Sequence, residues 1–367
     1  MRAAVFLGPG QPLRIQTVRK PRPRRGEVLV EVHACGLCHT DLHVLLGEVA
    51  FPVPAVLGHE IAGRVAELGE GVEGLALGDP VVGTFIMPCG CCRYCYRGRD
   101  DLCETFFHYN RLHGRLYDGE TRLFTPDGQP LAMYSMGGFA EYAVVPATAV
   151  YRLPDSLPLV PSAILGCAVM TAYGAVRHGG AIRPGDSVAV VAVGGVGLNM
   201  VQWARVFGAS QVVAVDVSLE KLDLARRLGA TDGVVAGPDA AQRVRALTGG
   251  GVDVALEALG RPETVSLALQ IVRDGGRVVL VGLAPQEVTA PLPITHMVRR
   301  SLQVVGSYGT RVRQDMPTLL RLVASGAIDV AGAVTRTYRF EAINEAFADL
   351  QQGRIPGRAV LHIRPPA

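Results

Sequence analysis

Short apolar or alternating runs, separated by turns rich in Gly, Pro and Asp, recur from the start of the chain to about residue 155. Five such runs are clear, at residues 3–7, 28–34, 61–68, 80–85 and 139–145. Alternation of apolar and polar residues is typical of strands, and the Gly-rich segments between the runs mark turns. This part of the chain is therefore predicted to form an antiparallel, barrel-like β module.

A different pattern begins at about residue 156. Residues 188–193 are continuously apolar, which is typical of a strand buried on both faces of a parallel sheet. Helical periodicity then alternates with strand-like runs, with helices predicted after the glycine-rich turn at 194–197 through residue 207 and at 219–228, 240–248 and 262–272, and strands at 211–215, 233–235, 252–256 and 277–283. This βαβ series predicts a doubly wound parallel sheet.

The order of these patterns predicts that the first domain is discontinuous. After about residue 300 the pattern becomes mixed, and residues 359–363 again have β character, so the tail is expected to rejoin the first module. The predicted fold class is α/β. A β-rich domain is expected at 1–160 and 301–367, and a doubly wound domain at 161–300.

Composition narrows the class of protein. The 367 residues carry a formal net charge of +3, which is too small to argue for a nucleic-acid partner. No signal peptide is visible, because Gly-Pro-Gly at 8–10 ends the first apolar run. The longest apolar stretch, 188–201, contains three glycines and is predicted to be strand, turn and helix rather than a membrane span. A cytoplasmic protein without a membrane partner is expected.

Eight cysteines in a chain of this length do not indicate a disulfide framework, and clustered cysteines in a reducing compartment more often bind metal. The spacing C-x2-C-x2-C-x7-C is formed by Cys89, Cys92, Cys95 and Cys103. Four thiolates at this spacing can close a structural zinc site, and the metal would supply folding energy that a segment without apolar periodicity lacks. Cys91 is left over, as a bystander thiol or a redox group.

A second group of metal-binding side chains is spread along the chain. Residues 38–43, Cys-His-Thr-Asp-Leu-His, follow a predicted strand and combine a thiol, imidazoles, a hydroxyl and a carboxylate. Gly-His-Glu at 58–60 adds another imidazole and carboxylate, and Cys167 lies in an apolar run at 163–169. A Cys/His/Cys set with water as the fourth ligand is typical of a catalytic zinc site.

Residues 104–137 form a long, polar, turn-rich segment, called the insertion below, with Asp-Gly pairs at 118–119 and 127–128. A stretch of this length in a compact domain is usually functional or locally ordered. Its large side chains could wall a pocket or pin the segment to the surface, and the sequence leaves both interpretations open. These side chains are Phe106, Phe107, Tyr134 and Met136.

The turn after the first buried strand has the pattern of a dinucleotide-binding site with one departure. In place of G-x-G-x-x-G it has Ala192, Gly194 and Gly197, with Gly195 and Val196 between the glycines. The glycines would let a pyrophosphate approach the backbone, and the helix that follows offers its N-terminal amides. Ala192 is tolerated in this turn if its φ is negative.

Asp216 ends the next strand, 19 residues past Gly197. A carboxylate there would accept hydrogen bonds from a ribose 2′-hydroxyl and repel a 2′-phosphate, which favours NAD over NADP. Lys221 either reaches the adenosine ribose or is a solvated helix residue.

These motifs resemble those of the zinc-dependent alcohol dehydrogenases of the medium-chain dehydrogenase/reductase superfamily. The resemblance covers nearly the whole chain and is carried by residues 38–41, 58–63, 78–79, 89–103, 167, 194–197 and 353–358. It implies a GroES-like catalytic domain, a Rossmann cofactor domain and an active site in the cleft between them. The insertion resembles the long members, which include animal alcohol dehydrogenases, glutathione-dependent formaldehyde dehydrogenase and bacterial benzyl alcohol dehydrogenases.

The resemblance also implies roles for single residues. Cys38, His59 and Cys167 would bind the catalytic zinc. Glu60 would approach the metal during ligand exchange, and Asp41 would accept a hydrogen bond from His59 and so fix its tautomer.

The proton and cofactor roles follow in the same way. Thr40 would bond the substrate oxygen and pass its proton through the cofactor ribose to His43. His39 would approach the pyrophosphate and Arg358 would pair with the cofactor phosphates. Val281 is also assigned to the cofactor site.

The implied reaction is reversible oxidation of an alcohol by NAD in a homo-oligomer, dimer or tetramer, with one catalytic and one structural zinc per chain and Phe85 in the pocket wall. One alternative is a conjugate-specific enzyme, for example for S-(hydroxymethyl)glutathione, in which Arg111 and Arg115 serve an anionic group. An alternative of another class is a non-catalytic, zinc-stabilised NAD-binding protein. Cys35, which forms a C-x-x-C with Cys38, is expected to be a bystander rather than half of a redox pair.

Overall fold

The computed structural model describes residues 1–364, and the chain divides into two compact units. Unit 1 contains Met1–Cys167, Arg311–Ala324 and the segment that starts at Val334. Unit 2 contains Ala168–Thr310 and Ser325–Ala333. The first boundary thus falls after residue 167 where 160 was expected, and the second after 310 where 300 was expected. The return of Ser325–Ala333 to unit 2 was not predicted, because these residues show no clear periodicity.

The smaller sheet of unit 1 has the strand order β2-β1-β4-β8-β7. Its strands are β1 (Arg2–Phe6), β2 (Arg14–Thr17), β4 (Ala55–Val56), β7 (Leu123–Phe124) and β8 (Pro130–Met133). Strand β1 pairs antiparallel with β2 and β4, whereas β4 and β8 run parallel. Because β7 and β8 come from the insertion, this segment extends a sheet of unit 1.

The larger sheet of unit 1 has the order β10-β6-β5-β3-β18-β17, with β9 also paired to β3. Its strands are β3 (Glu27–Leu37), β5 (Ile61–Leu68), β6 (Pro80–Gly83), β9 (Tyr142–Pro146), β10 (Val150–Arg152), β17 (Val334–Arg339) and β18 (Arg358–His362). Strand β18 pairs antiparallel with the end of β3, from Ala34 to Leu37. The prediction that the tail rejoins the first module is therefore confirmed.

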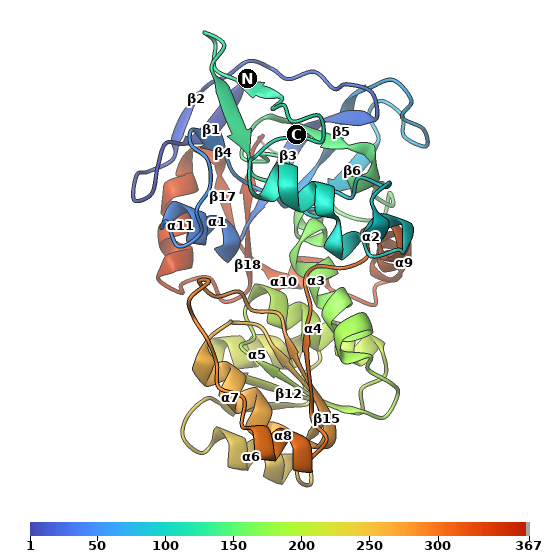
Figure 1. Cartoon of the computed structure of the whole chain (residues 1–367), viewed down its shortest axis with the longest axis vertical. Helices are drawn as coiled ribbons and strands as arrows, with labels where there is room; N and C mark the ends of the chain where they lie inside the picture. Colours follow the sequence, from blue (N-terminus) through green and yellow to red (C-terminus); the bar gives the residue numbers. More distant parts are fainter. Residues whose placement is uncertain (365–367) are drawn as a thin grey trace. The chain divides into compact units, whose positions relative to one another are not determined.

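Short helices connect these strands (Figure 1). The α-helices of unit 1 are α1 (His39–Leu45), α2 (Arg93–Tyr96), α9 (Val312–Ala324) and α11 (Ile343–Gln351). Single 3₁₀ turns span Asp100–Leu102, Ala147–Ala149, Pro161–Gly166 and Phe340–Ala342, and a π-helical turn spans Phe106–Arg111. Helix α1 begins directly after β3 because Cys38 is extended, with φ −125°, and its sulfur accepts a hydrogen bond from the amide of Thr40.

Unit 2 is organised on a six-stranded sheet with the order β13-β12-β11-β14-β15-β16, in which every recorded pair is parallel. Its strands are β11 (Ser187–Val191), β12 (Gln211–Asp216), β13 (Asp232–Val235), β14 (Val252–Glu257), β15 (Val272–Leu280) and β16 (Gln303–Gly306). This is the strand order 3-2-1-4-5-6 of a dinucleotide-binding fold, in which the order of strand addition reverses between β11 and β14. The predicted doubly wound sheet is confirmed.

The helices of unit 2 are α3 (Ala168–Gly174), α4 (Gly195–Val206), α5 (Leu219–Arg227), α6 (Ala240–Leu247), α7 (Pro262–Ile271), α8 (Ile294–Arg299) and α10 (Val330–Ala333), with a π-helical turn at Ala175–Gly180. In the chain, α4 to α8 connect successive strands of this sheet, whereas α3 precedes β11 and α10 follows β16 (Figure 1). All five residues of β11 are buried, as the continuous apolar run predicted. Within residues 1–364, no helix is long and apolar enough to cross a membrane.

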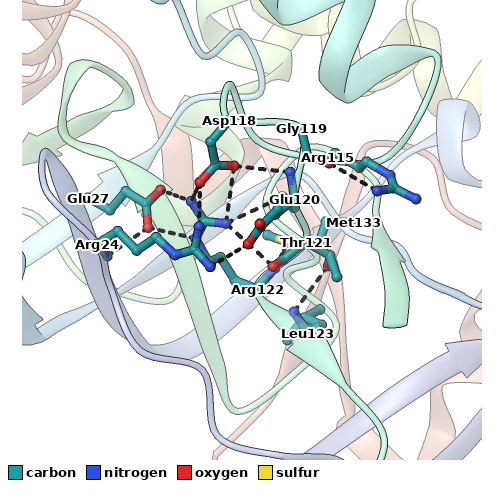
Figure 2. A network of polar contacts seen from close by, with 10 residues as sticks. All are labelled: Arg24, Glu27, Arg115, Asp118, Gly119, Glu120, Thr121, Arg122, Leu123 and Met133. Carbon is teal, nitrogen blue, oxygen red and sulfur yellow. Dashed lines mark hydrogen bonds and ion pairs between the residues drawn. The ribbon is translucent and has the colours of Figure 1, made fainter. Parts of the chain in front are cut away.

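The insertion is anchored to unit 1 by both apolar and charged contacts. Phe106, Tyr134 and Met136 are at most 1% exposed, so the interpretation that these side chains pin the segment fits three of the four, while Phe107 is half-buried. Figure 2 shows the charged contacts, in which the guanidinium of Arg122 lies between carboxylates that include Glu27 of β3.

Candidate functional site

The sequence-predicted catalytic ligands converge in unit 1. Ligand atoms of Cys38, His59, Glu60 and Cys167 all lie within 4.8 Å of one another, and all four residues are buried. Cys38 stands between β3 and α1, His59 and Glu60 lie between β4 and β5, and Cys167 ends the 3₁₀ turn Pro161–Gly166. Two sulfurs and an imidazole nitrogen form a donor set that suits zinc and leaves a position for another ligand.

The imidazole of His59 is oriented by Asp41. The Nδ1 atom lies 3.2 Å from Oδ1 of Asp41, which also accepts a hydrogen bond of 3.1 Å from the amide of Gly58. A proton held on Nδ1 by this carboxylate leaves Nε2 as the atom that can bind a metal. Burial lowers the pKa of His59, but Asp41 and the neighbouring Cys38 raise the pKa to about 9.

The two cysteine sulfurs of this cluster interact directly. A hydrogen bond from Cys167 is the main cause that holds the pKa of Cys38 well below its usual range, and the same bond raises the pKa of Cys167. The lowered pKa of Cys38 favours the ionised sulfur that zinc requires, whereas His59 must lose the proton on Nε2 before it can bind the metal.

Glu60 is packed more tightly than the sequence indicated. Its side chain is in ion-pair contact with Nη2 of Arg358, the first residue of β18, and both side chains are at most 4% exposed. A Cβ atom added to Gly36 of β3 would lie 2.2 Å from Oε2 of Glu60. Arg358 was predicted to pair with cofactor phosphates. The structure gives it Glu60 as a partner, so that prediction now depends on the remaining guanidinium nitrogens.

The remaining polar residues of the 38–43 segment lie on α1. The hydroxyl of Thr40 is 3.4 Å from the sulfur of Cys38. His39 is exposed at the first position of the helix, and His43 is half-buried near its end. The sequence analysis missed Glu48, whose Oε2 contacts Nδ1 of His43. The signal was present, since a carboxylate follows the helix in the turn made by Gly47.

Aromatic rings surround the imidazole of His59. Phe85 and Tyr134 approach it edge-on, with ring centroids 6.0 Å and 5.8 Å away, and Phe51 approaches Tyr134 at 4.9 Å. The guanidinium of Arg111 lies over the ring of Tyr134, 4.4 Å from its centroid. Phe51 was not predicted, because a single Phe before a Pro-rich stretch gives no periodic signal.

The four cysteines of the predicted structural site also converge. The sulfurs of Cys89, Cys92, Cys95 and Cys103 lie within 4.8 Å of one another. Amide hydrogen bonds of 3.3 to 3.5 Å reach these sulfurs: Cys92 N to Cys89, Cys95 N to Cys92, and Cys89 N and Phe106 N to Cys103. Burial raises the pKa of Cys89, but bonds from Thr105 and backbone amides outweigh it and bring the pKa to about 6. This chemistry fits a closed four-thiolate zinc site.

An ion pair with a buried carboxylate, which the sequence did not reveal, supports this cysteine segment. Arg313, in α9, donates to Oδ1 of Asp100 at 2.7 Å and to the carbonyl of Cys95 at 2.7 Å. Asp100 is 1% exposed. The two residues are far apart in sequence, so no local pattern could have paired them.

The two leftover cysteines differ. Cys91 is exposed, with its sulfur 3.7 Å from that of Cys89, whose bond to it is the main cause that raises the pKa of Cys91. Cys35 is fully buried in β3, and burial raises its pKa well above the usual range. A buried neutral thiol is a packing residue, which fits the bystander interpretation of Cys35.

The glycine-rich turn of unit 2 links β11 to α4. A Cβ atom on Gly197 would lie 2.1 Å from the carbonyl oxygen of Ala192, so the helix requires a glycine there in order to pack. A Cβ on Gly194 would meet nothing within 4 Å, so packing within the chain does not explain this glycine. Such free space beside the amides of Gly195 and Val196, at the start of a twelve-residue helix, fits an approaching pyrophosphate.

The condition set for Ala192 is not met. Its φ is +71°, in the left-handed region, whereas a negative φ would have let alanine replace glycine without strain. Its amide donates to the carbonyl of Val215 at 2.8 Å, which ties the turn to β12 in this conformation. A non-glycine residue there carries about 1–2 kcal/mol of strain.

Asp216 is fixed at the end of β12. Its Oδ2 accepts a hydrogen bond from the amide of Val193 and its Oδ1 from the amide of Ser218, both 3.0 Å long. Each carboxylate oxygen accepts two bonds, so each keeps one site for a ribose hydroxyl. Lys221 is half-buried in the first turn of α5, and Val281 follows β15. All these residues belong to unit 2.

Comparisons with known proteins agree with these sites. Residues 24–155 match the family described as the alcohol dehydrogenase GroES-like domain, and residues 195–325 match the zinc-binding dehydrogenase family. The NDMA-dependent alcohol dehydrogenase of Amycolatopsis methanolica is 36% identical over 98% of each chain. The S-(hydroxymethyl)glutathione dehydrogenase of Synechocystis sp. is 36% identical over 98% of this chain and 99% of its own.

Solved structures show the same likeness. An alcohol dehydrogenase zinc-binding domain protein from Burkholderia ambifaria superposes with a TM-score of 0.94 at 35% identity. The benzyl alcohol dehydrogenase of Acinetobacter calcoaceticus superposes with a TM-score of 0.92 at 30% identity, and each comparison covers 99% of both chains. With its two converging cysteine-containing clusters and its doubly wound unit, the chain belongs to the zinc-dependent alcohol dehydrogenases of the medium-chain dehydrogenase/reductase superfamily.

Proposed function

We propose that the protein oxidises an alcohol to its aldehyde or ketone, reversibly, with NAD as the hydride acceptor. The observation that carries this proposal is the buried set of Cys38, His59 and Cys167, with Asp41 holding the imidazole. In this proposal zinc at these ligands supplies a Lewis acid that lowers the pKa of an alcohol, and the nicotinamide supplies the hydride acceptor.

The residues around the cluster have distinct roles in this proposal. Thr40, whose hydroxyl lies 3.4 Å from the sulfur of Cys38, accepts the proton of the substrate alcohol and passes it toward His43. Glu60 stays close to the ligands as a carboxylate that can replace one during exchange, and Phe85 orients the substrate. The four-cysteine site binds a second, structural zinc.

The choice of NAD is supported by the geometry at the end of β12. Asp216 is 6% exposed and its carboxylate is held by two amides, so a 2′-phosphate would meet a fixed negative charge. We assign the pyrophosphate to Gly194, Gly195, Val196 and Gly197, with His39, Lys221, Val281 and Arg358 as further cofactor contacts. The NDMA-dependent relative makes NDMA a second acceptor to be tested.

An activity panel tests the proposal. Aliphatic, allylic and aryl alcohols would each be assayed with NAD, NADP and NDMA as acceptors. The proposal expects turnover with NAD and a preference for NAD over NADP. Turnover with NDMA and none with added NAD would contradict the cofactor assignment, and no turnover on any alcohol would contradict the activity.

A second candidate substrate is an anionic conjugate such as S-(hydroxymethyl)glutathione. The observation that favours it is the position of Arg111. Its guanidinium lies over the ring of Tyr134, and its positive charge acts to lower the pKa of Cys167. Arg115, the other arginine considered, is exposed and donates to the carbonyl of Gly119 at 3.0 Å. Formaldehyde oxidation that requires glutathione, and that Arg111→Met impairs more than Arg115→Met, would favour the conjugate over a free alcohol.

We also propose that the chain forms a homo-oligomer through the β16 edge of unit 2. Strand β16 is at the end of the sheet, and the segment before it exposes Ile294 and Val298 to 78% and 72%. An open strand edge beside exposed apolar side chains is typical of an interface. Light scattering distinguishes a dimer or tetramer from a monomer, and a monomeric protein would contradict the proposal.

A further inference from the structure

A second histidine has the same kind of carboxylate partner as the metal-cluster histidine. Nδ1 of His43 contacts Oε2 of Glu48, just as Nδ1 of His59 lies near Asp41. The two pairs differ in exposure. His59 and Asp41 are at most 3% exposed at the side chain, whereas His43 and Glu48 are 28% and 40% exposed. The second pair can therefore exchange protons with water.

The backbone after α1 fixes the position of Glu48. Gly47 has φ +80°, which turns the chain back on the helix, and its neighbour Pro9 leaves little room for a side chain there. The amides of Glu48 and Val49 both donate to the carbonyl of His43, at 2.9 Å and 3.2 Å. The residue whose side chain contacts the imidazole is thus tied to the backbone of that same histidine.

The contact determines which ring nitrogen is basic. A neutral imidazole carries one proton, and a carboxylate at Nδ1 retains it there as a donor. Nε2 then carries the free lone pair and is the atom that can accept a proton. Without the carboxylate of Glu48, the two tautomers of His43 would interchange and its imidazole could rotate.

We propose that Glu48 is a positioning residue for proton release, holding His43 with Nε2 as the proton acceptor. The inference rests on the proposed function, in which the alcohol proton leaves through Thr40 and His43. The proton passes from the substrate hydroxyl along this route to Nε2 of His43 and then to water. The other ring proton stays on Nδ1, which donates it in a hydrogen bond to the Glu48 carboxylate. No bond other than O–H and N–H changes in this step.

The first test is spectroscopic and needs no turnover. Protein labelled with ¹⁵N at histidine is studied at a pH where His43 is neutral, with His43→Gln used to assign its signals. The proposal expects the Nδ1–H tautomer in the wild-type protein. It expects a mixture of tautomers in Glu48→Ala and the wild-type pattern in Glu48→Asp if the shorter carboxylate still reaches the ring. A wild-type His43 with its proton on Nε2, or a tautomer unchanged in Glu48→Ala, would overturn the proposal.

The second test measures kcat and KM for alcohol oxidation. Loss of a carboxylate that orients a metal-binding histidine typically costs 10- to 100-fold, and by analogy kcat of Glu48→Ala should fall by about that factor with KM little changed. Glu73→Ala, at an exposed carboxylate, is the matched control and should leave kcat unchanged. An unchanged kcat in Glu48→Ala would overturn the relay role. Wild-type protein that shows the expected tautomer but oxidises no alcohol would instead contradict the proposed function.

Discussion

Replacing Arg122 by Met tests whether buried charges hold the insertion to unit 1. The side chain of Arg122 is 4% exposed and that of Glu27 is 10% exposed. Arg122 donates to Glu27 at 2.6 Å and 3.0 Å and to Asp118 at 2.7 Å (Figure 2). Met fills much of the same volume without a charge. Glu27 would keep the hydrogen bond from the amide of Arg24, 2.9 Å long, but would lose its countercharge.

The expected cost follows from this burial. Removing one partner of a buried ion pair costs about 3–5 kcal/mol, because the other charge stays buried and uncompensated. An exposed pair is worth about 0–1 kcal/mol. Since about 1.4 kcal/mol corresponds to a factor of ten, the open form of the insertion should become about two to nearly four orders of magnitude more populated.

Native-state proteolysis measures this population. When opening and closing are fast, the rate of cleavage within 104–137 follows the fraction of molecules in which the segment is open. Arg93→Met is the control, because Arg93 and Glu104 are 68% and 45% exposed in their ion pair, and it should change the rate about fivefold or less. The double variant Glu27→Gln/Arg122→Met should be cleaved more slowly than Arg122→Met alone. Cleavage of Arg122→Met no faster than that of Arg93→Met would show that the buried ion pair does not hold the insertion to unit 1.

Three further predictions address the sites. Ala192→Gly should stabilise unit 2 by roughly 0.5–1 kcal/mol, because the relief of left-handed strain exceeds the entropy that glycine adds to the unfolded chain. The gain is measured as a shift in the unfolding midpoint, and a loss of stability would show that the strain is absent. Gly36→Ala should displace Glu60, because the new methyl group would lie 2.2 Å from Oε2 of Glu60. The content of catalytic zinc should fall while NAD binding persists, and an unchanged zinc content would contradict this prediction. Asp216→Ser should raise kcat/KM for NADP relative to NAD by about tenfold or more, since a fixed charge is removed; an unaltered ratio would remove Asp216 from cofactor selection.

The regular parts of the fold were predictable because they depend on local periodicity. The apolar run at 188–193 is typical of a strand buried on both faces, and the structure buries all of β11. The β character of the tail was likewise visible, and β18 pairs with β3. The four-cysteine site at 89–103 was predictable from its spacing, because four ligands so close in sequence have few ways to surround one metal ion.

The long-range charge pairs were not predictable in the same way. Asp100 with Arg313 and Glu60 with Arg358 each join residues that are far apart in sequence, and which charges meet depends on the packed topology. The contact of Arg358 with Glu60 was therefore not foreseen, and the assignment of Arg358 to the cofactor phosphates stays a prediction. The sequence also left the φ of Ala192 open. In the structure the bond to Val215 ties the turn to the sheet, and this overrides the local preference of alanine.

The two-zinc dehydrogenase proposal is tested by zinc content, measured together with alcohol turnover in the wild-type protein and in Cys38→Ser. Two zinc ions per chain are expected in the active wild-type protein, one at each cluster. In Cys38→Ser the proposal predicts one zinc ion, no turnover and intact NAD binding. Full activity in a preparation with a single zinc ion per chain, or turnover that survives in Cys38→Ser, would contradict it.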